Sequence, residues 1–248
     1  MSASLIEWTE ETWNPLTGCT KISAGCQHCY AERMAKRLQA MGLDHYRAGF
    51  ELAVHPEKLN IPRRWKRPRM VFVNSMSDLF HDRVSDEFIR DVFRVMNETP
   101  WHTYQVLTKR AQRLWSLSRG LTWTPNIWMG VSVESHSWRS RIRLLSDVAA
   151  AVRFLSCEPL LGPLPDMALQ GIHWVIVGGE SGPGARPMHP DWAESLLYQC
   201  RGAGVPFFMK QLGGHPDKRG QIEQLPAHLR VRMFPGDTWT ETVEPCQP

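Results

Sequence analysis

Short apolar runs alternate with helical patterns along most of this chain, and this alternation restricts the possible folds more than any other feature. After an extended segment at 7–14, buried strands are expected at 70–74, 104–108, 127–133, 152–157, 173–178 and 205–210. Helices are expected at 30–42, 86–97, 110–118, 137–148 and 190–199. Strands that alternate with helices form parallel sheets through βα units. The sequence therefore predicts an α/β protein with a full or partial (β/α) barrel of six or seven parallel strands.

The length of 248 residues is sufficient for one large domain with a substantial core. We expect the barrel to occupy residues 1–214. Residues 215–248 contain Trp239 and scattered charges but no clear periodicity, so they are expected to form a C-terminal extension.

The composition is that of an ordinary globular protein, with 42% hydrophobic and 22% charged residues. A net charge of +4 and a pI near 8.8 make the chain mildly basic, which favours encounters with polyanions. Residues 1–11 lack the basic flank and apolar core of a signal peptide, and no run approaches the roughly 20 apolar residues of a membrane helix. We therefore expect a cytoplasmic protein without a membrane partner.

Half of the six cysteines lie within eleven residues, between the first expected strand and the first expected helix. Cys19, Cys26 and Cys29 form the pattern C-x6-C-x2-C. In a reducing compartment such a group indicates metal or redox chemistry rather than disulfides. Structural zinc usually has four protein ligands, and His28 is the nearest possible fourth. A [4Fe–4S] cluster held by three thiolates leaves one iron open for a non-protein ligand, and this hypothesis is favoured over zinc. The isolated thiols, expected to be buried or incidental, are Cys157, Cys200 and Cys246.

Nearly every expected strand ends in polar residues. In parallel α/β barrels the loops at the carboxyl ends of the strands build the active site, so these residues are expected to meet the cysteines at one mouth. Gly178 and Gly179 would let the backbone approach a ligand closely. The polar residues and glycines at the strand ends are Asn74, Ser75, Asp78, Lys109, Ser132, Glu134, Glu158, Gly178, Gly179, Glu180, Lys210 and Gln211.

The densest positive run lies at 63–69, just before an expected strand. Arg63 and Arg64 could bind phosphates while Trp65 stacks on a base. A solvated loop that leads into the strand is an equally good interpretation.

Several segments together resemble the radical S-adenosylmethionine (SAM) superfamily, and most closely its phage-associated three-cysteine-motif family. The matching segments are T-W-N-P at 12–15, G-C-T at 18–20, G-C-Q-H-C-Y-A-E at 25–32, N-S-M-S-D-L-F at 74–80, L-T-K-R at 107–110 and G-G-E-S-G at 178–182. With the strand end at 210–211 they cover about residues 8–214. One departure is the cysteine spacing: the usual superfamily motif separates its first two cysteines by three residues, whereas six separate them here.

The resemblance implies an enzyme of radical SAM type, with a [4Fe–4S] cluster on Cys19, Cys26 and Cys29. The cluster would take an electron from an external donor and cleave SAM to a 5′-deoxyadenosyl radical. Carboxylate and hydroxyl groups of Ser132, Glu134 and Glu158 would suit the ribose hydroxyls or the ammonium group of SAM, and Lys109 or Arg110 would suit its carboxylate. The implied cofactor-binding residues are Asn74, Ser75, Asp78, Lys109, Ser132, Glu134, Glu158, Gly178, Gly179 and Glu180.

The phage association, the basic run and eleven tryptophans suggest a nucleobase or nucleic-acid substrate in a bacterial or phage-infected host cell. Isomerisation of an amino-acid-modified thymine during phage DNA hypermodification is a suitable reaction. The residues expected on the substrate side are Arg63, Arg64, Trp65, Lys210 and Gln211. The alternative hypothesis is a non-catalytic nucleic-acid-binding module with a zinc-stapled loop, in which Arg63, Arg64 and Lys66 contact the phosphates.

Overall fold

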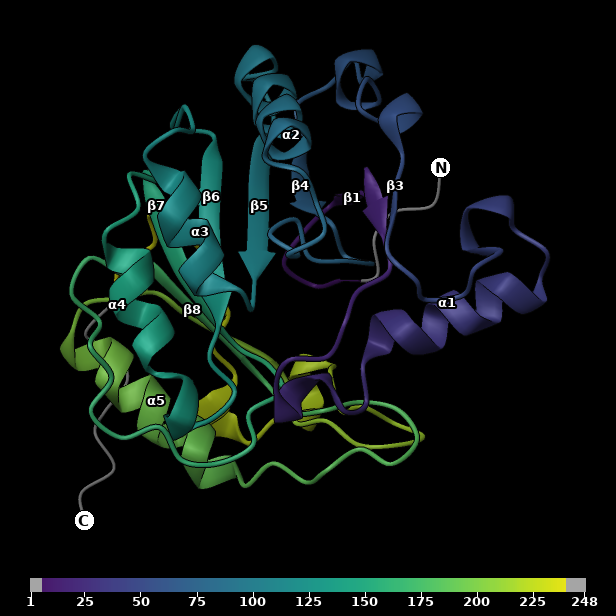
Figure 1. Ribbon diagram of the computed structural model, residues 1–248. Coiled ribbons are helices and arrows are strands. Elements are labelled where there is room, and N and C mark those ends of the chain that lie inside the picture. Colours follow the sequence, from purple (N-terminus) through teal and green to yellow (C-terminus); the bar gives the residue numbers. More distant parts are fainter. Residues whose placement is uncertain (1–5, 240–248) are drawn as a thin grey trace.

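Seven parallel strands form one curled sheet, a half barrel, in the computed structural model, which describes residues 6–239 (Figure 1). The order across the sheet is β1-β4-β5-β6-β7-β8-β9, and every neighbouring pair is parallel. This confirms the predicted α/β class and shows a partial barrel. The strands are β1 (Glu11–Trp13), β4 (Met70–Val73), β5 (Thr103–Thr108), β6 (Ile127–Ser132), β7 (Val152–Cys157), β8 (Trp174–Gly178) and β9 (Phe207–Gln211).

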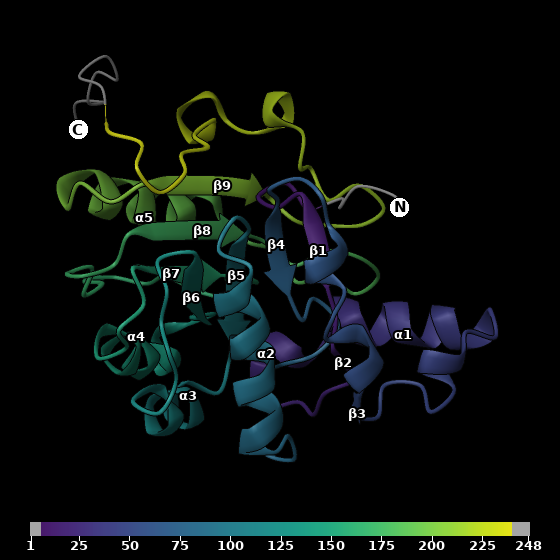
Figure 2. The same ribbon diagram turned by 90° about the horizontal axis from the view of Figure 1, so that it is seen from above.

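Four helices cover the convex face of the sheet, whereas α1 (Tyr30–Ala40) projects to one side (Figures 1 and 2). The covering helices are α2 (Asp86–Glu98), α3 (Ala111–Ser118), α4 (Ser140–Ser146) and α5 (Pro190–Gly202). The helix expected at 137–148 is instead a 3-10 turn, η5 (His136–Trp138), followed by the shorter α4. A separate antiparallel pair consists of β2 (Leu16–Thr17) and β3 (Ala53–Val54). The remaining 3-10 turns are η1 (Ala24–Cys26), η2 (Asp44–Tyr46), η3 (Pro56–Lys58), η4 (Pro62–Arg64), η6 (Ile222–Gln224) and η7 (Ala227–Leu229).

Helix α2 illustrates why the sequence folds in this way locally. The Ser85 side chain accepts a hydrogen bond from the Phe88 N–H at 3.2 Å, which caps the helix, and Asp86 and Glu87 place negative charge in its first turn. Phe88, Ile89, Val92, Phe93, Val95 and Met96 form one buried face. That face packs into the main core between the sheet and its helices.

Alternate residues of each strand face opposite sides of the sheet, and both sides are buried. On β6, Met129 and Val131 belong to the main core on the convex side. On the concave side, a second cluster fills the half barrel with Trp8, Phe154, Trp174, Ile176 and Phe208. A parallel sheet buried on both faces produces continuous apolar runs rather than alternating ones, and this explains the strand patterns in the sequence.

The described part of the C-terminal segment packs along β9. Met209 N–H donates to Val231 O at 2.8 Å, and Met233 N–H donates to Phe207 O at 2.9 Å. Trp174 Nε1 donates to Met233 O at 2.7 Å, and Leu225 and Leu229 join the main core. Residues 215–239 are therefore integrated with the sheet. Residues 240–248, including Cys246, lie outside the described residues.

Two of the isolated thiols, Cys157 on β7 and Cys200 on α5, are fully buried, as predicted. Within residues 6–239, every helix is too short or too polar to cross a membrane.

Gly130 provides a test of the concave core. It pairs in register with Phe154, and a Cβ at this glycine would lie 2.4 Å from the Phe154 ring. We expect Gly130→Ala to destabilise the protein by about 1–3 kcal/mol, measured by urea unfolding, because the buried ring has to move. A Cβ at Gly162 would meet no atom within 4 Å. Gly162→Ala should therefore be nearly neutral, and equal losses in the two variants would contradict this account.

A candidate active site at the carboxyl ends of the strands

A cavity of about 270 Å³ lies at the carboxyl ends of the strands and contains the three clustered cysteines. Its apolar side is formed by Phe50, Phe72 and Leu107. The predicted residues that line it are Cys19, Cys26, Cys29, Asn74, Ser75, Asp78, Lys109, Ser132, Glu158, Gly179, Glu180, Lys210 and Gln211. The structure thus brings together nearly all of the polar strand ends that the sequence indicated.

The loop that carries the cysteines packs closely against neighbouring residues at two glycines. Gly18 has a φ of +79°, and a Cβ there would lie 2.0 Å from Glu51 O, so a glycine is required beside Cys19. A Cβ at Gly25 would lie 2.6 Å from the Glu134 side chain. Cys29 is the N-cap of α1, where the helix favours negative charge.

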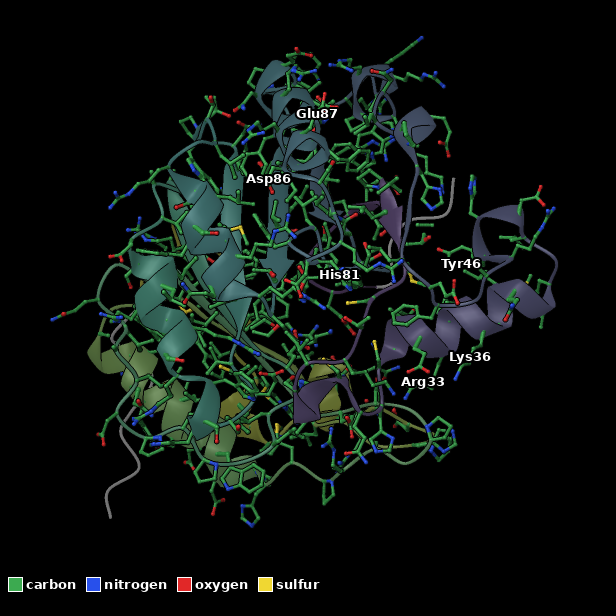
Figure 3. The ribbon with its side chains drawn as sticks, in the orientation of Figure 1. Arg33, Lys36, Tyr46, His81, Asp86 and Glu87 are labelled. Carbon is green, nitrogen blue, oxygen red and sulfur yellow. The ribbon has the colours of Figure 1, made fainter. Side chains whose placement is uncertain are left out.

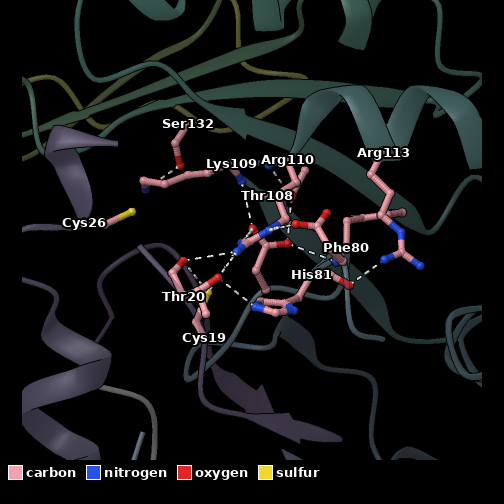
Figure 4. A network of polar contacts seen from close by, with 12 residues as sticks. Cys19, Thr20, Cys26, Phe80, His81, Thr108, Lys109, Arg110, Arg113 and Ser132 are labelled. Atoms are coloured by element: carbon pink, nitrogen blue, oxygen red, sulfur yellow. Dashed lines mark hydrogen bonds and ion pairs between the residues drawn. The ribbon is translucent and has the colours of Figure 1, made fainter. Parts of the chain in front are cut away.

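Arg110 links the first cysteine to the sheet (Figure 4). Its Nη1 donates to Cys19 Sγ at 3.4 Å and pairs with Asp78 Oδ2 at 3.2 Å. Its Nη2 donates to Thr20 O and Thr20 Oγ1 at 3.1 and 2.9 Å. Thr20 Oγ1 also lies 2.9 Å from Nε2 of His81, a residue labelled in Figure 3 as well. The cysteine loop is therefore connected to the ends of β4 and β5 by one buried ion pair.

The environments of Cys19 and Cys26 differ. Burial and the negative charge of Asp78 raise the pKa of the Cys19 thiol to about 11, against the opposing effect of Arg110. Although burial acts in the opposite direction, hydrogen bonds from Ile22 and Ser23 and the charge of Lys109 lower the pKa of Cys26.

Glu134 and Gly178 lie behind the cavity wall, so the expectation that they contact a cofactor directly is revised. Glu134 is fully buried and accepts from Arg141 Nη1 at 2.7 Å and from Ser23 Oγ at 2.5 Å. It therefore joins the cysteine loop to β6. A Cβ at Gly178 would lie 2.8 Å from Glu158 Oε1, so this glycine makes room for that carboxylate.

On the other side of the cavity, two further carboxylates are paired. Lys210 Nζ lies 2.8 Å from Glu158 Oε1, and this carboxylate raises the pKa of Lys210 although burial opposes it. Glu180 accepts from Arg186 Nη2 at 2.5 Å, and, against the effect of burial, Arg186 lowers the pKa of Glu180. Arg186 Nη2 also donates to Ala24 O at 2.9 Å, which joins the segment after β8 to the cysteine loop.

Two side chains donate hydrogen bonds to backbone carbonyls in the segment that follows β8. Gln211 Nε2 donates to Gly179 O at 2.8 Å, so Gln211 supports the neighbouring strand end. Arg33 on α1 donates to Ser181 O at 2.6 Å and to His28 O at 3.0 Å (Figure 3).

Asn74 is the most unusual side chain in the cavity. It is 3% exposed, and neither Oδ1 nor Nδ2 has a hydrogen-bond partner. Its φ of +62° places it in the left-handed region, which asparagine tolerates better than most residues. A buried amide without partners costs about 1–3 kcal/mol, so this side chain is an unusual one to find at the edge of a cavity.

The predicted role of the basic run is wrong for Trp65. Its ring is 7% exposed and packs at 84° against His102, with the ring centroids 5.4 Å apart, so it cannot stack on a base. Arg63 pairs with Glu98. Arg63, Arg64 and Trp65 precede β4 and lie at the amino end of the sheet, because parallel strands place their carboxyl ends at the cavity.

The residues that the sequence did not reveal as part of the site are mostly partners of the predicted ones. Arg141 and Arg186 pair with Glu134 and Glu180, and Thr20 and His81 extend the Arg110 network. Tyr30, at the cavity, has an exposed fraction of 54%. The acidic residues at the strand ends could have indicated that nearby arginines belong to the site. The sequence does not reveal, however, which arginine pairs with which carboxylate.

The fold and the site together define an α/β protein with a parallel half barrel and a thiol-lined cavity at the carboxyl ends of its strands. The chain belongs to the family described as "Protein of unknown function (DUF5131)", whose model matches residues 3–243. Neither a curated protein nor a solved structure matches the chain.

The difference between Cys26 and Cys19 can be measured by alkylation of metal-free protein with iodoacetamide. At pH 8 about a thousandth of Cys19 is thiolate, and the lowered pKa of Cys26 gives that thiol a larger thiolate fraction. The higher nucleophilicity of a high-pKa thiolate offsets only part of this difference, so we expect Cys26 to react faster than Cys19. Alkylation of Cys19 should increase steadily from pH 7 to 9. Peptide mass spectrometry would show both effects, with buried Cys157 unmodified as the control. Faster reaction of Cys19 would contradict the assigned environments.

Proposed function

We propose that the protein is a radical SAM enzyme that acts on a nucleobase or nucleic acid, with isomerisation of an amino-acid-modified thymine as the reaction. The observation that carries the proposal is the convergence of three thiols and the unpartnered amide of Asn74 on one cavity. The sequence resemblance to the phage-associated family supports the same function.

The three thiols do not form a compact site of the kind that a single zinc ion needs. Zinc holds sulfur at about 2.3 Å, so tetrahedral thiolates lie about 3.8 Å apart. Among residues 6–239, only His45, His55 and Glu57 form a group of three potential ligands with all atoms within 4.8 Å. The three cysteine sulfurs therefore do not all lie within 4.8 Å of one another, and a cubane, whose thiolates bind separate irons, does not require that they do.

When bound and reduced by an external donor, the cluster would supply the electron that cleaves SAM into methionine and a 5′-deoxyadenosyl radical. Arg110 would offset the charge of the Cys19 thiolate through its hydrogen bond to Sγ. The Glu134 carboxylate also supports the cysteine loop, because it accepts hydrogen bonds from both Ser23 and Arg141.

Residues on the cavity wall would hold the cofactor and exclude water. Asn74 can donate and accept at once, as recognition of a base edge or an amino-acid group requires. Lys109 Nζ, which donates to Ser132 Oγ at 3.0 Å, would pair with the carboxylate of SAM. Phe72 and Leu107 present apolar surface, which would keep water from a reactive intermediate.

We propose that Tyr30 and Lys210, which line the cavity, contact the substrate, instead of the basic run at the opposite end of the sheet. Tyr30 combines an exposed ring with a position on the cavity, as stacking on a base requires. Lys210 lines the cavity beside Glu158 and could contact a polar substituent of the base.

Anaerobic reconstitution with iron and sulfide tests the proposal. We expect a brown protein with about four irons per chain, and SAM with a reductant should yield 5′-deoxyadenosine. Cys26→Ala should lose the cluster and the product. Cys200→Ala is the matched control, because Cys200 is buried on α5 and does not line the cavity. A colourless protein that retains one zinc would support the nucleic-acid-binding module instead, with DNA binding that falls steeply with salt.

Asn74→Gly tests the orphaned amide without straining the backbone, because glycine accepts a positive φ. The unfolding midpoint in urea should change little, since relief of an unpaired buried amide offsets the entropy of glycine. The affinity of the reconstituted enzyme for SAM, measured by equilibrium dialysis, should fall about ten-fold or more with the lost hydrogen bonds. Asn97→Ala, on α2 and outside the cavity, serves as the control. Unchanged SAM affinity in Asn74→Gly would remove this residue from the site.

A further inference from the structure

A second group of metal-ligating side chains lies outside the cavity. His45 is in η2, the turn marked by Tyr46 in Figure 3, whereas His55 follows β3 and Glu57 is in η3. One ligand atom from each lies within 4.8 Å of the others. These residues come from two segments of the chain, and none of the three lines the cavity at the strand ends.

The distances suit a shared cation better than direct contacts. Glu57 Oε1 lies 3.9 Å from His45 Nδ1 and 3.7 Å from His55 Nδ1. Both exceed the roughly 2.7–3.2 Å of a hydrogen bond. Zinc binds imidazole nitrogen and carboxylate oxygen at about 2.0–2.2 Å, so tetrahedral donor pairs lie about 3.4 Å apart. Contraction by a few tenths of an ångström would bring Glu57 to this distance from each histidine, and the two imidazole nitrogens lie within 4.8 Å of each other.

His55 also has the support that a ligating histidine needs. Its side chain is buried, and its Nε2 lies 2.8 Å from Thr17 Oγ1. With the proton on Nε2, the ring donates to Thr17 and its Nδ1 lone pair faces Glu57. Metal-bound histidines usually make such a bond with their second nitrogen. His45 and Glu57 are partly exposed, which leaves an entry path and room for a water ligand.

We propose that His45, His55 and Glu57 form a binding site for a divalent transition-metal ion of the zinc type. Two imidazoles and one carboxylate suit zinc better than calcium or magnesium, which prefer oxygen ligands. Bound metal joins η2 and η3 to β2 through Thr17, two residues before Cys19. The site therefore has a structural role beside the cysteine loop.

The test uses full-length protein in which Cys19, Cys26 and Cys29 are all replaced by serine, so that thiolates at the cavity do not bind the probe. Titration with Zn²⁺ by calorimetry should give one ion per chain. Co²⁺ should give weak visible bands without a thiolate charge-transfer band. His45→Ala and Glu57→Gln should each weaken binding by about ten-fold or more, and Thr17→Val by about ten-fold.

The matched control is His189→Ala, because His189 Nδ1 faces a single carboxylate, Asp191 Oδ2, at 3.3 Å. This variant should bind Zn²⁺ like its parent. Absence of binding by the parent, or equal losses in the control and in His45→Ala, would overturn the proposal.

His45 and Glu57 have side-chain exposures of 46% and 59%, so their replacement leaves the core intact. As a second measurement, Zn²⁺ at a fixed concentration near the Kd of the serine-substituted parent should raise the Tm of that parent, and should raise that of Glu57→Gln by clearly less. A similar rise in both would also overturn the site. The outcome is independent of the proposed enzymatic function, because the background lacks the three cysteines.

Discussion

Parallel pairing with level strand ends is the constraint on which the rest of this structure depends. Ser132 pairs with Ser156, and Cys157 pairs with Val177, so adjacent strands finish at nearly the same height. Whatever follows a strand is therefore delivered to one rim, and whatever precedes a strand is delivered to the opposite one. The cysteine loop is joined to this rim by the isolated bridge between Gly18 and Ser77. Charge density in the sequence has no influence on this division, which explains why the basic run lies far from the thiols.

The carboxylates around the cavity are all paired before any ligand enters, whereas Lys109 adds one further positive charge. Each of these carboxylates has a cation of its own, and the pairs are Asp78 with Arg110, Glu134 with Arg141, Glu158 with Lys210 and Glu180 with Arg186. Removal of one partner from such a buried pair leaves an uncompensated charge and is strongly destabilising. Three of these pairs also connect to the cysteine loop through Cys19, Ser23 or Ala24. The same contacts therefore support both the stability of the rim and the positions of the thiols.

The period of two along a strand explains how much of the fold and site was predictable. Phe72, Leu107 and Phe208 point into the half barrel, and two residues later Asn74, Lys109 and Lys210 line the cavity. Residues without this periodicity could not be placed. Trp65 is in an irregular loop, so its burial depends on a contact with His102 that is distant in sequence. Arg141 and Arg186 lie outside the strands, and their partners depend on how the helices and loops pack.

The way the C-terminal segment covers β9 has a consequence for association between molecules. A half barrel, unlike a closed one, leaves two edge strands whose backbone groups can pair with another chain. The backbone of β9 is occupied by Val231 and Met233, and β1 is only three residues long and begins with an acidic residue. Both edges therefore offer a poor template for an incoming strand. The open sheet is protected against edge-to-edge aggregation without closing the barrel.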